Sequence, residues 1–370
     1  MAAVTDCLIV GGGVVGLSLA WRLAQRGLAV TLLDRGPLAS EASWAGAGIL
    51  PPAELSTAIH PYDILRGISI AEHPRWAAEL KELTGIDNEY SVCGAIYLAR
   101  QAGEAAALSA WSHTLLEEKI TVSRLDSASL AKEEPALAHV TGVRSAYLLP
   151  QEAQLRNPRH LQALIAACRN AGVNLVPNTP VVDFEISGDK LISVVTPTGK
   201  FNADNFCLCT GAWSAILAQK LRMEMGVVPI RGQMLLYKTE QPLCKRVINE
   251  GPRYIVPRRD GHLLIGSTEE EAGFDKSTTS ATLADLQSFA FSLFPSLEKA
   301  TLVKHWSGLR PGSFDSMPYL GNLPGLCNAF VAAGHFRSGL YLSPGTALAM
   351  TALICREPCP VDLSPFRLGR

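Results

Sequence analysis

The chain has 370 residues, of which 48% are hydrophobic and 18% are charged, and its formal net charge is −1. This composition is typical of a globular protein with a sizeable core, and the length suggests two or three domains. Because Lys and Arg are spread along the chain, a basic surface for nucleic acid or anionic lipid is disfavoured, and a small-molecule site is the better expectation.

The N-terminal segment predicts a strand, a helix and a second strand. Residues 7–10 are a short apolar run, helical spacing of apolar residues begins at Val14 and ends at Gly27, and residues 29–33 form a second apolar run. These elements make one βαβ unit, whose two strands must be parallel.

The glycines between this strand and helix have the spacing of a dinucleotide-binding turn. Gly11, Gly13 and Gly16 follow the pattern G-x-G-x-x-G. They permit, in order, a tight turn, close approach to a pyrophosphate and close packing of helix on strand. Asp34, after the second strand, is placed to accept hydrogen bonds from an adenosine ribose. The pattern occurs once and by itself leaves NAD and FAD open.

Two later segments are candidates for contacts with a long cofactor. Residues 40–50 (SEASWAGAGIL) are small, hydroxylic and glycine-rich, although a flexible loop is the simpler interpretation. Residues 207–214 (CLCTGAWS) end a strand in a Thr-Gly turn, where the backbone can approach a ligand closely.

The remaining patterns predict alternating helices and strands. We expect helices over residues 64–84, 102–118, 158–171, 282–294 and about 340–354. We expect strands over 91–99 (with an exposed face), 173–176, 181–187, 191–196, 206–209, 229–238, 253–268 and 301–308. The predicted fold is α/β with α+β elements, a Rossmann-like nucleotide domain interleaved with an antiparallel-sheet domain. Without a basic leader or a run of ~20 apolar residues, the expected location is cytoplasmic.

The nine cysteines predict no disulfide framework and no metal site. The count is odd, and several cysteines lie in apolar runs, which favours buried, reduced thiols. Cys207 and Cys209 share one face of a strand but have no second pair or nearby histidine to complete a metal site.

Six segments together resemble the glycine oxidase branch of the FAD-dependent amino-acid oxidases over nearly the whole chain. They are VGGGVVGLSLAWRLAQRG, ASWAGAGIL, TGAWS, YIVPRRDGHLLIGST, WSGLRPGSFDSMPYLG and AAGHFRSGLYLSPGT. The resemblance implies an FAD domain of segments 1–85, 147–225 and 304–370, and a substrate domain of 86–146 and 226–303. It implies non-covalent FAD, since residues 309–313 lack the cysteine of covalent-flavin relatives, and a homotetramer.

The activity that this resemblance implies is oxidative deamination of glycine, sarcosine and small D-amino acids. Oxygen is the acceptor, and the products are an imine, which becomes keto acid and ammonia, and hydrogen peroxide. In bacteria such enzymes commonly supply iminoglycine for the thiazole of thiamine. The alternatives are a D-amino-acid dehydrogenase that passes electrons to a quinone, and a non-catalytic FAD-binding partner.

The resemblance also implies site residues. Arg310, Tyr254 and Arg337 are the expected catalytic residues. The expected cofactor-binding residues are Gly11, Gly13, Val14, Val15, Gly16, Asp34, Arg35, Ser43, Ala47, Gly48, Ile49, Val182, Gly211, Trp213, His335, Arg337, Ser338, Gly339 and Leu340.

Arg310 has a physical reason to contact substrate. No acidic residue lies within four positions of it, and its planar fork matches the α-carboxylate of an amino acid. The alternative is an ion pair with a distant carboxylate, and Tyr254 has the alternative of a half-buried strand aromatic. With both in place a hydride can leave Cα of a neutral amine without a protein acid or base.

Two further features of the C-terminal half each allow two interpretations. Backbone N–H groups from Arg337 to Leu340 can hold negative charge on the reduced flavin, or simply start a helix, and His335 is expected to be structural. Glu269, Glu270 and Glu271 form a charge run, which predicts a solvated loop; if Glu269 instead faces the pocket, it would favour a small or cationic substrate.

Overall fold

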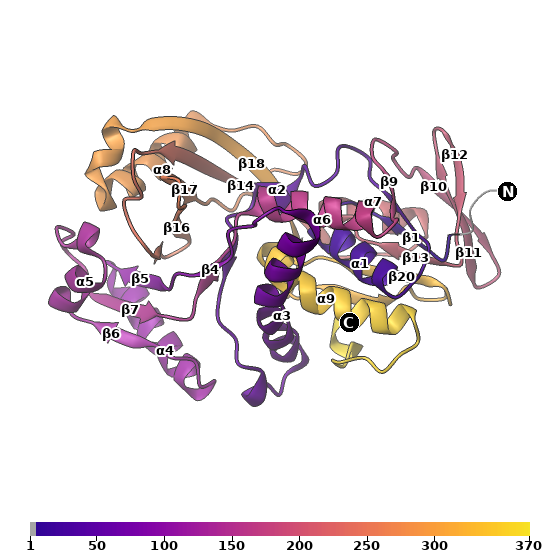
Figure 1. Ribbon diagram of the computed structural model, residues 1–370, viewed down its shortest axis with the longest axis horizontal. Helices are drawn as coiled ribbons and strands as arrows, with labels where there is room; N and C mark the ends of the chain where they lie inside the picture. Colours follow the sequence, from indigo (N-terminus) through magenta and orange to yellow (C-terminus); the bar gives the residue numbers. More distant parts are fainter. Residues whose placement is uncertain (1–4) are drawn as a thin grey trace.

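The structure, a computed structural model, describes residues 5–370, and the predicted βαβ unit forms at its start (Figure 1). Strands β1 (Cys7–Val10) and β2 (Val30–Leu33) pair in parallel, and α1 (Val14–Gln25) connects them. The glycine turn therefore lies at the carboxyl end of β1, where the ligands of open α/β sheets bind.

This unit is the centre of a six-stranded sheet with the order β19-β20-β13-β1-β2-β9. Its pairs are parallel except for the edge pair of β19 with β20. The other strands are β9 (Asn174–Val176), β13 (Asn205–Leu208), β19 (Tyr319–Asn322) and β20 (Ala329–Ala333).

Helices cover one face of this sheet, and a small sheet lies on the other. Cys7 and Ile9 pack toward helices that include α1, whereas Leu8 and Val10 pack in a second cluster with Leu191. The helices of the first face are α3 (Pro61–Thr84), α6 (Asn157–Asn170) and α9 (Gly339–Ile354). The second face carries α7 (Ser214–Lys220), β10 (Asp183–Ser187), β11 (Lys190–Thr196) and β12 (Gly199–Asn202).

A second large sheet has eight strands in the order β18-β14-β17-β16-β15-β5-β7-β6, on the left in Figure 1. It is antiparallel except for the pair β15–β5. Its strands are β5 (Ala95–Ala99), β6 (Ser123–Leu125), β7 (Ser145–Leu149), β14 (Val227–Lys238), β15 (Val247–Glu250), β16 (Arg253–Pro257), β17 (His262–Gly266) and β18 (Thr301–Ser313).

The two faces of this sheet have different neighbours, because side chains alternate along each strand. Leu235, Ile255 and Ile265 pack in one cluster with α8 (Ser280–Leu293). The opposite face carries Met234 and Tyr254, which lie in a separate cluster. The outer part of the sheet also contacts α4 (Ala102–Glu117) and α5 (Ser127–Glu133).

The expected single strand over 91–99 was wrong. Gly94, with φ 71°, separates β4 (Ser91–Val92) from β5, and the two strands belong to different sheets. Four of the five residues of β5 are buried, so it has no exposed face. The small sheet that contains β4 has two other strands, β3 (Ile49–Leu50) and β8 (Ala153–Gln154). They join the segment after α2 (Ala42–Ala45) to the region before α6.

The expected domain division stays a proposal. Strand β7 contains the expected boundary at residue 147 and β18 the one at 304, and both strands pair within the eight-stranded sheet. Within residues 5–370, no helix has the length and apolarity to cross a membrane.

Candidate functional site

A cavity of about 610 Å³ is lined by residues from both large sheets. It extends from the start of α1 to Arg310 on β18, and it is bounded by residues 42–51 and 332–341. Predicted site residues that line it are Gly13, Val14, Val15, Ser43, Ala47, Gly48, Ile49, Gly211, Tyr254, Arg310, His335, Arg337, Ser338, Gly339 and Leu340. Segments far apart in the sequence thus meet around one space.

The glycine turn is closed by backbone contacts that leave no room for side chains. Gly11 has φ 111°, and a Cβ there would overlap the carbonyl oxygen of Cys209. A Cβ on Gly16 would overlap the carbonyl oxygen of Gly11. Gly13 lies on the cavity side of this turn. Gly11 and Gly16 therefore have the turn and packing roles that their spacing predicted, and Gly13 stays the predicted point of approach to a pyrophosphate.

Asp34 holds this turn from behind. Its carboxylate accepts hydrogen bonds from the backbone N–H groups of Gly12 (2.7 Å) and Gly36 (2.8 Å). Burial raises the pKa of Asp34, and these two hydrogen bonds oppose the shift. Each carboxylate oxygen keeps a free lone pair, so a ribose hydroxyl can still donate to Asp34.

Three other predicted cofactor contacts lie beyond the cavity lining. The Arg35 guanidinium lies 3.5 Å from the centre of the Trp213 ring. Trp213 also stacks on Phe274, with ring centres 5.6 Å apart. Val182 is exposed, and its N–H donates to the carbonyl of Val195. Arg35, which follows Asp34 in the chain, and Trp213 thus form a stacked pair.

The segment 42–49 lies against the start of α1 and has room for a flat ligand. Ser43 Oγ accepts a hydrogen bond from the N–H of Val14 (2.9 Å), and the Asn157 amide donates to the Ser43 carbonyl (3.0 Å). Asn157 Oδ1 is buried beside the cavity without a partner. A cofactor with an imide N–H, as in a flavin ring, would satisfy this acceptor, so the residues present fit an FAD.

Arg258, directly after β16, fixes the same segment from the eight-stranded sheet, and no pattern in the sequence indicated this role. It is 5% exposed and donates to the carbonyls of Ala47 (2.7 Å) and Leu155 (3.0 Å) and to Gln154 (2.7 Å). Burial lowers the pKa of Arg258 to about 10. An arginine whose guanidinium donates to backbone carbonyls of two other segments holds those segments together.

Arg310 reaches the cavity without an acidic partner among the described residues. It lies within β18, and its guanidinium donates to the Thr268 carbonyl (2.9 Å) and to Ser267 Oγ (2.7 Å). Salt bridges in residues 5–370 include none to Arg310. Gly232 on β14 makes space for it, since a Cβ there would overlap the guanidinium. The fork is held in place while its positive charge remains available to a ligand.

Tyr254 lies close to Arg310 on the same face. A Cβ on Gly266, directly opposite in the ladder, would lie 2.7 Å from the tyrosine ring. Among residues 5–370, the Tyr254 hydroxyl makes a hydrogen bond only to Met234 Sδ, at 3.8 Å. Sulfur is a weak acceptor, so the hydroxyl is free to donate to a stronger one. Two glycines thus provide the space in which Arg310 and Tyr254 face the cavity.

The segment before α9 forms the opposite wall. His335 is 2% exposed, its Nε2 lies 3.1 Å from Thr346 Oγ1, and burial lowers its pKa to about 3. This neutral, buried ring agrees with a structural role. The short helix Phe336–Ser338 leads into α9, whose first N–H groups have no partner within the helix and lie at the cavity.

The charge run 269–271 is exposed at Glu269 and Glu271, as predicted for a solvated loop, but two of its members also form specific contacts. Glu269 Oε1 lies 3.1 Å from Arg337 Nη1, which makes an ion pair at the cavity edge. Glu270 binds Arg231 (2.6 Å) and Gln233 (2.9 Å) behind the sheet. Arg337 is therefore partly neutralised, and Glu269 meets the pocket only through it.

The cavity also has lining residues that the sequence analysis missed. Tyr97 and Asn249 line it beside Tyr254, and the Tyr97 hydroxyl donates to the buried Glu152 (2.7 Å). Burial raises the pKa of Glu152 to about 7. Arg66 and Tyr341 line the other side. Pairing between distant strands brings Tyr97 to Asn249, and packing of α3 against α9 brings Arg66 to Tyr341, so no local pattern could have identified them.

The cysteines are reduced, as predicted, and the described residues hold no metal-binding cluster. Cys7, Cys207 and Cys209 are buried, with the Sγ atoms of the last two 3.8 Å apart. Burial raises the pKa of Cys7, and the hydrogen bond with Cys209, together with burial, raises the pKa of Cys207. These thiols are core side chains rather than nucleophiles.

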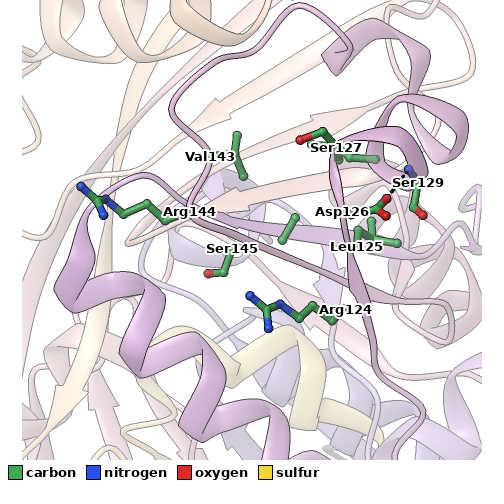
Figure 2. A pocket seen from close by; sticks show the side chains of 10 residues that line it. Arg124, Leu125, Asp126, Ser127, Ser129, Val143, Arg144 and Ser145 are labelled. Carbon is green, nitrogen blue, oxygen red and sulfur yellow. Dashed lines mark hydrogen bonds between the residues drawn. The ribbon is translucent and has the colours of Figure 1, made fainter.

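A second hollow, of about 420 Å³, lies between β6, α5 and β7 (Figure 2). Figure 2 shows the Asp126 carboxylate hydrogen-bonded to the backbone of Ser129 on its floor. Arg124 and Arg144 flank it and are exposed. None of the predicted site residues lies there.

Comparisons with known proteins indicate the family to which such a fold and cavity belong. The family described as DAO, FAD dependent oxidoreductase, matches residues 6–353. A glycine oxidase of Pseudomonas aeruginosa is 35% identical over 367 residues, 97% of each chain. A glycine oxidase of Geobacillus kaustophilus is 36% identical, over 99% of this chain and 97% of its own. A crystal structure of glycine oxidase from Geobacillus kaustophilus superposes with a TM-score of 0.93, covering 99% of this chain and 98% of that one.

Proposed function

This chain belongs to the DAO family of FAD-dependent oxidoreductases and is an FAD-dependent amino-acid oxidase, and we propose that its substrates are glycine, sarcosine and small D-amino acids. The observation that carries the proposal is Arg310. A guanidinium that faces a cavity without an acidic partner selects a ligand with a carboxylate. The Tyr254 hydroxyl can donate to the same carboxylate.

The small size of the substrate follows from what surrounds Arg310. Met234, Tyr254 and Gly232 line the cavity around it, so the carboxylate end is narrow. Arg310 and Tyr254 hold the carboxylate and orient Cα toward the 45–49 segment. The chain's contribution is to fix this geometry and exclude water.

No carboxyl group lines the described cavity, and His335 is neutral at physiological pH. The chain therefore places no strong base at Cα, and the substrate amine must bind in its neutral form. A bound FAD supplies the acceptor for a hydride from Cα and, through its reoxidation by oxygen, hydrogen peroxide. The imine product is then hydrolysed by water to an oxo acid, with release of ammonia from glycine and D-amino acids and of methylamine from sarcosine.

We propose that the FAD is held non-covalently by the residues named from the family resemblance. Gly13 and the start of α1 would hold the pyrophosphate, Asp34 the ribose, and Asn157 the flavin ring. The N–H groups at the start of α9 are preorganised for negative charge on the flavin. The resemblance further supports a role in forming the thiazole of thiamine, a cytoplasmic location and a homotetramer.

Anaerobic reduction of the purified holoenzyme tests this function. Glycine, sarcosine or D-alanine should bleach the flavin absorbance, and oxygen should restore it with release of hydrogen peroxide. Bleaching followed by reoxidation only with a quinone or dye would indicate a dehydrogenase. A yellow protein that none of these amino acids bleaches would contradict an oxidase and support a non-catalytic FAD-binding role.

A further inference from the structure

A single row of side chains crosses the cavity face of the eight-stranded sheet. Residues directly opposite one another in neighbouring strands point to the same face. The pairing registers place seven residues in this row, in the order Trp306, Met234, Gly266, Tyr254, Asn249, Tyr97 and Tyr147. Tyr254 therefore has Arg310 and Met234 on one side and Asn249, then Tyr97, on the other.

A carboxyl group lies beneath the Asn249 end of this row. Glu152, between β7 and β8, has no exposed surface, and its Oε2 accepts the hydrogen bond of the Tyr97 hydroxyl at 2.7 Å. Its Oε1 has no hydrogen-bond partner. Burying an unpaired carboxyl group is costly, and neither the fold nor the oxidation of glycine requires one here.

The Asn249 amide is oriented by the same group. Its side chain is near enough to Glu152 to favour the ionised carboxylate, yet Asn249 Nδ2 is buried and makes no hydrogen bond of good geometry. Once ionised, Glu152 only accepts hydrogen bonds, so it would hold the Asn249 amide with Nδ2 toward itself and leave Oδ1 free to accept from a ligand. The Tyr97 hydroxyl, whose proton is given to Glu152, likewise offers only a lone pair to the cavity.

The cavity thus has two ends of opposite polarity. Arg310 donates at one end, and Tyr97 and Asn249 accept at the other, in front of a carboxyl group. Adjacent strands are ~4.8 Å apart, so Asn249 lies about one strand spacing beyond Tyr254. A substrate whose carboxylate is held by Arg310 extends its side chain toward these acceptors.

We propose that Tyr97, Asn249 and Glu152 form a subsite for a hydrogen-bond donor on the substrate side chain, so that the enzyme takes small D-amino acids whose short side chains end in an ammonium or hydroxyl group. The proposal rests on the proposed function for the placement of the carboxylate at Arg310. A cationic group gains most, because the buried carboxyl group lies behind the two acceptors.

Another carboxylate at the cavity edge is a competing source of such a preference. Glu269 could attract a cation, but its Oε1 is paired with Arg337 at 3.1 Å. Burial and Glu152 raise the pKa of the Tyr97 hydroxyl, and Arg337 is the cation that opposes this shift. An experiment must therefore separate Glu152 from Glu269.

Calorimetry of ligand binding to the FAD-loaded enzyme can separate the effects of Glu152 and Glu269 without catalysis. 4-Aminobutanoate and pentanoate have the same length and a carboxylate at one end, but only the first has an ammonium group at the other. At a pH well above the pKa of Glu152, we expect 4-aminobutanoate to bind at least about tenfold more tightly. Arg310→Ala should abolish binding of both, which places them in the cavity.

Variants then show which carboxyl group causes the preference for the ammonium-bearing ligand. Glu152→Gln and Tyr97→Phe should each reduce the ratio of the two affinities to near one, while Tyr147→Phe, the same change one strand farther along the row, should keep it. Tyr147 is a matched control because it does not line the cavity. Equal binding by the wild type, or a preference that survives Glu152→Gln, overturns the proposal. A preference lost in Glu269→Gln and kept in Glu152→Gln also overturns it.

Kinetics distinguish failure of the subsite from failure of the proposed function. D-2,4-Diaminobutanoate and D-norvaline repeat the same comparison on oxidisable amino acids, and the first should reduce the flavin with the higher kcat/KM. If calorimetry finds the preference but neither amino acid, nor glycine, bleaches the flavin, the amino-acid oxidase function fails and the subsite stands. If both bleach it equally well, the subsite is overturned and the function stands.

Discussion

The guanidinium of Arg310 occupies the space above Gly232 that any other residue at position 232 would fill with its Cβ. The two residues lie on adjacent strands, β18 and β14, offset by two positions along the ladder. The backbone of β14 is thus shaped around the end of a flexible side chain. This relationship allows the position of the arginine to be changed without removing it.

Gly232→Ala should impair activity while leaving the protein folded. The new methyl group displaces only the flexible end of Arg310, so the melting temperature should change little. A misplaced carboxylate-binding group costs about a hundredfold in rate when it shifts by roughly 1 Å, and we expect kcat/KM for glycine to fall about 10- to 100-fold. Gly103→Ala, on α4 where a Cβ meets nothing, is the control. Unchanged kinetics would show that Arg310 does not contact the substrate.

Arg310→Ala should lower kcat/KM for glycine by roughly 30- to several-thousandfold, since losing one member of a buried charge pair costs ~2–5 kcal/mol. The protein should remain yellow, because Arg310 otherwise binds only Ser267 and Thr268. Arg310→Lys should recover little activity, because an ammonium group lacks the planar fork. Primary amines without a carboxylate serve as the comparison. Normal glycine kinetics in an unstable Arg310→Ala protein would assign the arginine a structural role.

Asp34→Ala should weaken FAD binding about ten- to a hundredfold, the effect of losing a charge-assisted hydrogen bond worth roughly 1.5–3 kcal/mol. Asp34 also binds Gly12 and Gly36 in the cofactor turn, so the stability of the FAD-free protein should be measured beside flavin retention on dialysis. Full retention of flavin would mean that Asp34 does not contact the ribose. A loss explained entirely by unfolding of the FAD-free protein would assign Asp34 to the turn alone.

Glu152 should make the stability of the protein fall with rising pH. Burial raises the pKa of Glu152 from 4.5 to about 7, so the folded protein favours the neutral acid. The resulting stabilisation is complete below the ordinary pKa and is lost as the pH rises through about 7, a change of about 3 kcal/mol. Tyr97, Asn249 and the Cys93 thiol face Glu152, and burial raises the pKa of both Tyr97 and Cys93.

Glu152→Gln imitates the neutral acid and should lack this dependence. The difference in unfolding free energy between variant and wild type should therefore grow from pH 5 to pH 8, as measured by denaturant unfolding at each pH. Parallel stability profiles would show that Glu152 is ionised throughout or that its charge is compensated.

The predictable part of the site is the part built from neighbouring residues. The turn at Gly11–Gly16 and the strand that ends at Asp34 form within one short βαβ unit, so spacing alone indicated both fold and ligand class. Arg310 was recognisable because no acidic residue lies near it in the sequence, and the structure brings no distant one to it either.

The unpredictable part depends on pairing between distant strands. Tyr97, Glu152 and Asn249 come from three segments that only the register of β5, β7 and β15 brings together, and a shift by one residue would turn Tyr97 and Asn249 to the other face. The partner of Glu269 is equally remote, because Arg337 precedes the last helix. A charge run by itself indicates solvent, whereas the ion pairs of Glu269 and Glu270 required the fold.

Successive side chains in the eight-stranded sheet point to opposite faces, so odd and even positions of each strand have different roles. Leu235, Ile255 and Ile265 hold the sheet to α8, while Met234 and Tyr254, at neighbouring positions in the strands, line the cavity. A change of substrate can thus be made by substitutions at every second residue, with the buried half of the strands left intact. The sheet is in this sense an evolvable surface, on which new specificities can arise without a matching loss of stability.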